Sequence, residues 1–277
     1  MACVWVTLRL LDAGVEPGTA VAINGIAFAV LCGVVEVLVP ETPEWKLDGG
    51  ELRADVLHMV LTNTIPAALF RTLFFSVVVA ASEHASRFLG GSLWPNAWPL
   101  LGQLAFALVA AEIASYSIHR FLHESRFFRW HSVHHSSSRM YFMLVGRKHP
   151  FQAFFTYGGR LSVLWFLGIP PDVFALYAVF TATNGYVQHS NIRMRSGVLN
   201  WILATPELHW AHHEKEPADS NANYGDVLIF LDLLLGTRRM PPDLAKLYAG
   251  VGLPDGTRVE QTYLGHLRLP FRWPARD

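Results

Sequence analysis

Long apolar runs constrain the fold of this 277-residue chain more than any other feature. A helix needs roughly 20 apolar residues to cross the hydrocarbon core of a bilayer. Backbone polar groups in lipid must be hydrogen-bonded within the segment, so runs of this length are expected to be helical. We predict spans at Val21–Val39, at Val56–Ala81, which Asn63, Pro66 and Arg71 interrupt, and at Trp98–Ile118.

A fourth apolar region, residues 151–187, is divided by Pro170 and Pro171. Proline breaks helices and also disfavours helix at the residue before it. We therefore expect two helical arms that form a membrane hairpin with its tip near the proline pair. Arg160 lies inside the first arm, which is accordingly expected to cross incompletely. Both ends of such a hairpin return to the same side of the bilayer.

The composition agrees with a membrane protein. Charged residues make up 16% of the chain, against about 25% in average soluble proteins. The net charge is zero, with 22 basic and 22 acidic residues, so nothing indicates a nucleic-acid partner. Cys3 and Cys32 are far apart and predict neither a disulfide framework nor a cysteine-based metal site.

Eight of the 13 histidines fall in three short clusters, one H-x-x-x-H and two H-x-x-H-H. Residues three or four apart lie on one face of a helix, so each cluster is expected to point its imidazoles in one direction. Imidazole is the commonest metal ligand in proteins. A tetrahedral ion takes about four ligands, so eight imidazoles predict a dinuclear site. The clustered residues are His119, His123, His131, His134, His135, His209, His212 and His213.

The remaining histidines need separate weighing. One histidine motif alone occurs by chance, and the metal prediction depends on the combination of three. His58, His84 and His266 stand alone in the sequence, and each is expected to be a hydrogen-bonded core residue or a surface residue.

The clusters are placed to share one side of the bilayer. His119 lies where the third apolar run ends, and the segment from residue 120 to 148 carries six basic residues against the single acid Glu124. Excess Lys and Arg beside a span marks the cytoplasmic side. The expected fold is all-α, an integral membrane helical bundle with a cytoplasmic, histidine-rich, metal-binding helical cap. Residues 1–118 would supply the N-terminal spans, and residues 119–277 the catalytic region including the hairpin at about 151–187, within one structural domain.

The histidine-rich segments resemble the fatty acid hydroxylase/sterol desaturase superfamily of membrane di-iron enzymes. The stretches that carry the resemblance run from about Glu112 to Thr237; they are EIASYSIHRFLHESRFFRWHSVHHSSSRMY, GRKHP, NGYVQHSNI, LNWILATPELHWAHH and NYGDVLIFLDLLLGT. The resemblance implies that the eight clustered histidines bind two iron ions, which zinc can replace during expression. His189 in QHSN matches a position that often supplies a further ligand. His149 in KHP matches a recurrent histidine that is a ligand, a hydrogen-bonding partner of one, or part of the substrate path.

Acidic residues near the clusters are candidates to orient the ligands. A metal-bound histidine usually donates its other N–H to a carboxylate, a carbonyl or water. Glu112 precedes His119 by seven residues on nearly the same helix face, with Tyr116 between them, and Asp232 follows the last cluster. Glu112, Tyr116 and Asp232 are therefore our candidate catalytic residues beyond the metal ligands. The superfamily often has Asp where this chain has Glu112, and its block after the late Asp is usually basic and aromatic rather than LLLGT.

The chemistry implied by the resemblance is O2-dependent hydroxylation or desaturation of an unactivated C–H bond in a lipid. A sterol, a hopanoid, a carotenoid, a fatty-acyl lipid and an alkylglycerol all remain open as substrates. No electron-transfer domain is visible, so electrons would come from a separate ferredoxin, cytochrome b5 or flavoprotein reductase. The alternatives are a metal-dependent lipid lyase or hydrolase on the same scaffold and, less favoured, a membrane metal transporter. The 18 arginines against 4 lysines hint at a bacterial source and an inner-membrane location.

Overall fold

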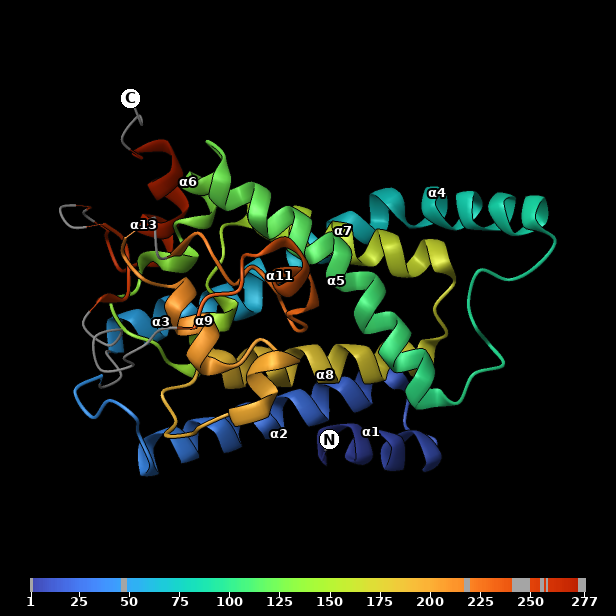
Figure 1. Cartoon of the computed structure of the whole chain (residues 1–277), viewed down its shortest axis with the longest axis horizontal. Helices are drawn as coiled ribbons and strands as arrows, with labels where there is room; N and C mark the ends of the chain where they lie inside the picture. Colours follow the sequence, from blue (N-terminus) through green and yellow to red (C-terminus); the bar gives the residue numbers. More distant parts are fainter. Residues whose placement is uncertain are drawn as a thin grey trace.

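Long helices make up most of the chain in this computed structural model, which describes residues 2–45, 49–216, 220–240, 250–254, 257 and 259–273. The described residues contain no β-strand, which confirms the all-α prediction for that part of the chain. In Figure 1 shorter helices gather at one end of the long ones. The long helices are α1 (Ala2–Asp12), α2 (Pro17–Leu38), α4 (Ile65–Leu89), α5 (Leu100–Glu124), α7 (Pro150–Leu167) and α8 (Pro171–His189), and the short ones are α3 (Gly49–Leu57), α6 (Phe128–His131), α9 (Pro206–His212), α11 (Phe230–Leu235) and α13 (Tyr263–Arg268).

Three helical segments are long and apolar enough to cross a membrane: Pro17–Leu38, Gly49–Leu89 and Leu100–Glu124. Each overlaps one of the predicted runs along most of its length. Large apolar side chains such as Ile26, Val37 and Phe88 are exposed on these segments. A surface of this kind suits lipid rather than water, because contiguous apolar area is rarely left open to solvent.

The second of these segments is interrupted. A π-helical turn, η1 (His58–Thr62), follows α3, and α4 begins after Thr64 with Pro66 in its first turn. Proline lacks an N–H and clashes with the carbonyl four residues earlier, so one regular helix cannot continue through this point. His58 and Thr62, at the two ends of this π-helical turn, are both buried in the protein interior.

The region predicted as a hairpin folds as two helices joined at the proline pair. Gly168 ends α7 in a left-handed conformation (φ 80°), and Pro171 occupies the first turn of α8. The two arms lie apart: α7 packs on α4 and α5, whereas α8 packs on α1, α2 and α5 (Figure 1). Neither arm is among the three segments long and apolar enough to span, and the position of the hairpin in a bilayer stays a prediction.

Close helix contacts hold the bundle around α5. Leu104, Ala107 and Ala111 of α5 pack with Leu164 of α7 and Leu176 of α8 in the main apolar core. On the other side of α7, Gly158 allows α4 to approach closely, because a Cβ atom there would lie 2.4 Å from the Phe70 ring. Helix α5 is thus fixed between the arms, and its C-terminal end enters the histidine-rich region.

Candidate metal centre

The structure brings the sequence-predicted histidines together at one end of the bundle in two groups of four. In each group one nitrogen from every ring lies within 4.8 Å of the others. The first group takes two residues from α5, one from α6 and one from α9; the second takes one from the end of α8. The first consists of His119, His123, His131 and His212, and the second of His134, His189, His209 and His213.

The rings of each H-x-x-H-H cluster lie together, with centroids 4.7 to 5.6 Å apart, but neither cluster serves a single group. His131 ends α6, and His134 lies in a separate 3-10 turn, η2 (His134–Ser136), so the chain between them is not one helix. These two residues belong to different groups. On α9, His209 and His212 are also divided between the groups. Each H-x-x-H-H cluster therefore contributes to both groups.

His135 belongs to neither group and lies between them. Its Nε2 is 3.1 Å from Nε2 of His131 in the first group. Its ring stacks on that of His213 in the second, with centroids 4.3 Å apart. The sequence did not reveal this intermediate position, because spacing gives the face of a residue but not the tertiary neighbour.

The distances between nitrogens fit metal coordination. Two nitrogens bound about 2.1 Å from one ion lie roughly 3.0 to 3.4 Å apart, depending on the coordination angle. The Nε2–Nε2 distance is 3.0 Å for His119 and His131, 3.2 Å for His134 and His189, and 2.9 Å for His189 and His209. Nε2 of His123 and of His212 is buried without a hydrogen-bond partner, as expected of a lone pair directed at an ion.

The opposite ring nitrogens fix the tautomers. Nδ1 of His119, His134 and His189 faces the carbonyl oxygens of Tyr224 (2.8 Å), Arg147 (3.1 Å) and Gly185 (2.7 Å), and Nδ1 of His212 faces that of Ala222 (2.8 Å). A carbonyl only accepts, so these rings carry their proton on Nδ1 and present a bare Nε2. Two bare nitrogens 3.2 Å apart, as in His134 and His189, cannot hydrogen-bond to each other. A shared cation removes this conflict, and the residues present fit a metal in each group.

Burial keeps these rings uncharged. Desolvation lowers the pKa of His131, His134, His135, His209, His212 and His213 well below 6.5. Neutral imidazole is the form that binds metals.

Glu112, Tyr116 and Asp232 do not touch the histidines directly. Glu112 accepts hydrogen bonds from the backbone N–H groups of residues 226, 227 and 228, at 2.7 to 2.9 Å. Asp232 accepts from the N–H groups of Tyr224 and Gly225, and the Tyr116 hydroxyl lies 2.8 Å from that of Thr237. Glu112 and Asp232 hold one loop, residues 222–228, whose carbonyls accept from His119 and His212. The ring of Tyr116 packs edge-to-face on that of Tyr224 in the same loop.

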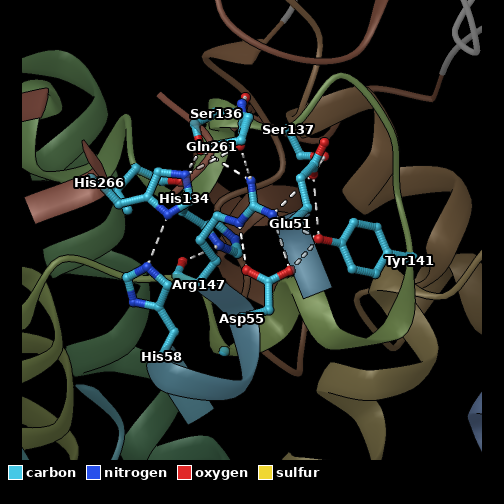
Figure 2. A network of polar contacts seen from close by, with 12 residues as sticks. Glu51, Asp55, His58, His134, Ser136, Ser137, Tyr141, Arg147, Gln261 and His266 are labelled. Atoms are coloured by element: carbon cyan, nitrogen blue, oxygen red, sulfur yellow. Dashed lines mark hydrogen bonds and ion pairs between the residues drawn. The ribbon is translucent and has the colours of Figure 1, made fainter. Parts of the chain in front are cut away.

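A buried ionic cluster lies behind His134 (Figure 2). The guanidinium of Arg147, fully buried, donates to Asp55 at 2.7 Å and to Glu51 at 3.0 Å, both in the segment that begins with α3. The carbonyl of the same residue accepts from His134. The cluster thus ties the second membrane segment to the second histidine group.

The cluster continues to two of the histidines that stand alone in the sequence. Arg147 donates to Oε1 of Gln261 at 3.0 Å, and that oxygen is 3.2 Å from Nε2 of His266. Nδ1 of His266 lies 3.0 Å from Nε2 of His58 (Figure 2). Their contact joins residues 208 positions apart, and no local pattern could have found it. His84, on α4, is exposed.

His149 lies outside both groups and begins α7. Its Nδ1 accepts from the N–H of Phe151 at 3.1 Å. Its ring packs against Trp130, with centroids 4.6 Å apart. Burial lowers the pKa of His149 to about 4, so the ring is neutral and able to act as the helix cap.

A cavity of about 1300 Å³ leads to the histidines. Its inner wall includes His119, His134 and His209, and its outer wall is formed by apolar side chains of α4, α7 and α8 such as Phe75 and Trp165. Ser115 and Leu122 of α5 also line the cavity. A long apolar chain fits such a space with one end at the histidines.

Comparison with known proteins agrees with this geometry. The sequence profile described as Fatty acid hydroxylase matches residues 104–237. The chain is 33% identical to ornithine lipid hydroxylase OlsE of Rhizobium tropici over an alignment of 255 residues. This alignment covers 91% of this chain and 75% of that protein. It is 31% identical over 184 residues to alkylglycerol monooxygenase of Danio rerio and 26% identical over 216 residues to that of Homo sapiens.

These alignments differ in extent. They cover 65% and 76% of this chain but 39% and 45% of the two alkylglycerol monooxygenases, so the chain spans less than half of their length. No solved structure matches it significantly. The profile match includes both four-histidine groups and the loop behind them. The relatives are hydroxylases and monooxygenases, and the chain is accordingly an oxidoreductase that belongs to the fatty acid hydroxylase/sterol desaturase superfamily.

Proposed function

We propose that this protein is a membrane-bound hydroxylase that uses two iron ions and O2 to oxidise a C–H bond of a membrane lipid. The observation that carries the proposal is the pair of four-histidine groups at the inner end of a largely apolar cavity. Iron bound there would supply O2 activation, with electrons from a separate ferredoxin, cytochrome b5 or flavoprotein reductase. Hydroxylation consumes O2, two electrons and two protons, and releases one water for each alcohol formed.

The protein's own residues would bind the metal ions, orient the histidine rings and shield the path of the lipid from water. Neutral imidazoles add no negative charge, so the bound ions keep their full strength as Lewis acids. The backbone carbonyls of Tyr224, Arg147 and Gly185 hold three of the rings in the required tautomer. The apolar outer wall excludes water from the path of the lipid. Glu112, Tyr116 and Asp232 act as positioning residues for the loop 222–228.

Among the lipids left open by the sequence, we favour an ornithine lipid or another lipid with an amino-acid head group. The support is the similarity to ornithine lipid hydroxylase along most of both chains. The relatives are described as hydroxylases and monooxygenases, which favours hydroxylation over desaturation. The bacterial relative and the basic segment at residues 120–148 support an inner-membrane location with the histidines on the cytoplasmic side.

Lipid analysis of cells tests the reaction. Membranes that contain ornithine lipid are expected to gain a form with one added oxygen atom when the protein is expressed, and only under air. The His134→Ala variant should remain in the membrane fraction and give no product. Conversion of lipid without O2 or reductant would instead indicate a lyase or hydrolase on the same scaffold and would overturn the oxygenase proposal.

Metal analysis tests the dinuclear site. The purified protein should contain about two metal ions per chain. His209→Ala in the second group and His212→Ala in the first should each lower this ratio, and the control His84→Ala should not. Stoichiometry is the stronger readout, since zinc can take the place of iron during expression. A ratio of one or less in the wild-type protein contradicts the proposal.

A further inference from the structure

Four charged side chains line the cavity among the residues that the structure describes: Arg71, Lys148, Arg160 and Asp226. Three are cationic and one is a carboxylate. Charges are costly in an apolar space unless each has a partner. The excess of positive charge is therefore a feature that a ligand could complement.

Two of the four charges compensate each other. Nη1 of Arg160 on α7 lies 2.6 Å from Oδ2 of Asp226, in the loop behind the first histidine group. Asp226 is itself fixed, because its N–H donates to Glu112 at 2.7 Å. The pair forms a polar edge of the cavity and leaves two cations, Lys148 and Arg71, without a carboxylate partner among the described residues. Arg71 is exposed, whereas Lys148 is partly buried, so Lys148 is the cation held inside the cavity.

Lys148 has spare hydrogen-bonding capacity. Its Nζ donates to the carbonyl of Val145 at 2.5 Å, and no carboxylate in the described part of the chain lies within ion-pair distance of it. An ammonium has three N–H donors, so two remain for a ligand in the cavity.

Lys148 also lies beside the second histidine group. The carbonyl of the preceding residue, Arg147, accepts from His134 of that group, and Lys148 lines the same cavity as His134, His189 and His209. It precedes α7, whose cavity face continues through Leu161 to Trp165. A polar head group at Lys148 would therefore leave an acyl chain directed along the apolar wall, away from the histidines.

We propose that Lys148, beside the Arg160–Asp226 pair, binds the anionic group of the lipid substrate, either a carboxylate or a phosphate. This deepens the proposed function and rests on it. It also assigns the site of oxidation, because a carbon within a few bonds of the anion is held next to the second histidine group, whereas the far end of the acyl chain is not.

Binding without turnover tests the subsite. The metal-loaded full-length protein in detergent is titrated, without reductant, with ornithine lipid and with the methyl ester of that lipid, which lacks the carboxylate charge. The wild-type protein should bind the acid about tenfold more tightly or better, as expected for a hydrogen bond to a charged group. A second arm compares phosphatidic acid with diacylglycerol of the same chains, and the arm with the larger preference identifies the anion.

Variants assign the preference to the lysine. Lys148→Gln should remove most of the preference for the anionic lipid, and Lys148→Arg should retain it. The control Arg87→Gln removes one positive charge from an exposed position of α4 and should bind as the wild type does. A wild-type protein that prefers the anion in neither arm overturns the proposal without any variant, as does a Lys148→Gln protein that keeps the preference. Metal content measured on the same samples separates the two proposals: two ions without lipid preference refute the subsite alone.

Discussion

At the scale of single residues, the partners of the histidine rings are backbone carbonyls, whereas the sequence led us to expect carboxylate side chains. The residue types and spacings were sufficient to select seven of the eight histidines in the two groups, together with His135, which lies between the groups. His189 was indicated by the family resemblance, and Glu112 and Asp232 were selected as partners of the ligands. Their contacts were not predictable, because Glu112 acts through the N–H groups of residues 226–228, and a sequence does not show which backbone atoms a side chain will meet. In the sequence, Lys148 is distinguished only as one of the six basic residues between positions 120 and 148.

Glu112→Gln tests this indirect arrangement. The glutamine amide would place an N–H₂ group against backbone donors, so the loop 222–228 should shift and His119 should lose its carbonyl partner. Removing a residue that hydrogen-bonds to a metal ligand typically lowers the metal affinity by about 10- to 100-fold. We expect metal content to fall after dialysis against a weak chelator, with the loss confined to about one ion. Glu83→Gln, on the exposed face of α4, is the control and should retain both ions.

Arg147→Met tests the ionic cluster behind His134. Methionine leaves Asp55 and Glu51 buried without their shared cation, and breaking a buried ion pair from one side costs about 3 to 5 kcal/mol. The variant should unfold at a clearly lower temperature in detergent. Arg272→Met removes an exposed arginine that pairs with Glu260, and should cost no more than about 1 kcal/mol. Equal melting temperatures for the two variants would contradict the role of the cluster.

At the scale of helices and loops, the apolar runs predicted the location of the spans, and the prolines predicted where helices end. Pro66 marks the start of α4 and Pro170–Pro171 the turn between α7 and α8. The separation of the two arms was not foreseen, because pairing depends on which faces fit α5. The hydrophobic pattern does not identify that neighbour when a helix is apolar on most of its surface.

Gly225→Ala tests the loop that carries the histidine partners. A Cβ atom at this position would lie 2.5 Å from the carbonyl oxygen of Leu228 and 2.9 Å from Oδ2 of Asp232. The first contact is with backbone, so relief requires the loop itself to move. We expect lower metal occupancy and at least a tenfold loss of hydroxylation. Gly25→Ala, in α2, meets no atom within 4 Å and should behave as the wild type; full occupancy and activity in Gly225→Ala would show that the loop is more tolerant than its contacts indicate.

At the scale of the whole molecule, the cap buries neutral histidines from distant segments, and this makes the metal-free protein sensitive to acid. Burial lowers the pKa of His149 to about 4 and of His266 to about 2, both from 6.5. The unfolded chain therefore binds more protons below pH 6.5, and stability is full above that value and falls as the pH decreases toward 4.

The measurement is the melting temperature of chelator-treated protein from pH 8 to pH 5. We expect little change down to about pH 6.5 and a steady decrease below it. His149→Asn keeps an acceptor at the start of α7 but does not titrate, so its decrease should be shallower. A melting temperature that stays constant to pH 5 would mean that these rings are not buried neutral in solution.

The division of each H-x-x-H-H cluster between the two groups has a consequence for how such a centre can be altered. No single stretch of this chain supplies one complete four-histidine group, since residues near 131 and near 209 each serve both groups. The first motif supplies one residue to each group, and the second supplies one to the first group and two to the second, so grafting either motif alone would transfer neither group whole. An engineer who wishes to alter only one of the two proposed metal sites therefore has to rewrite both motifs.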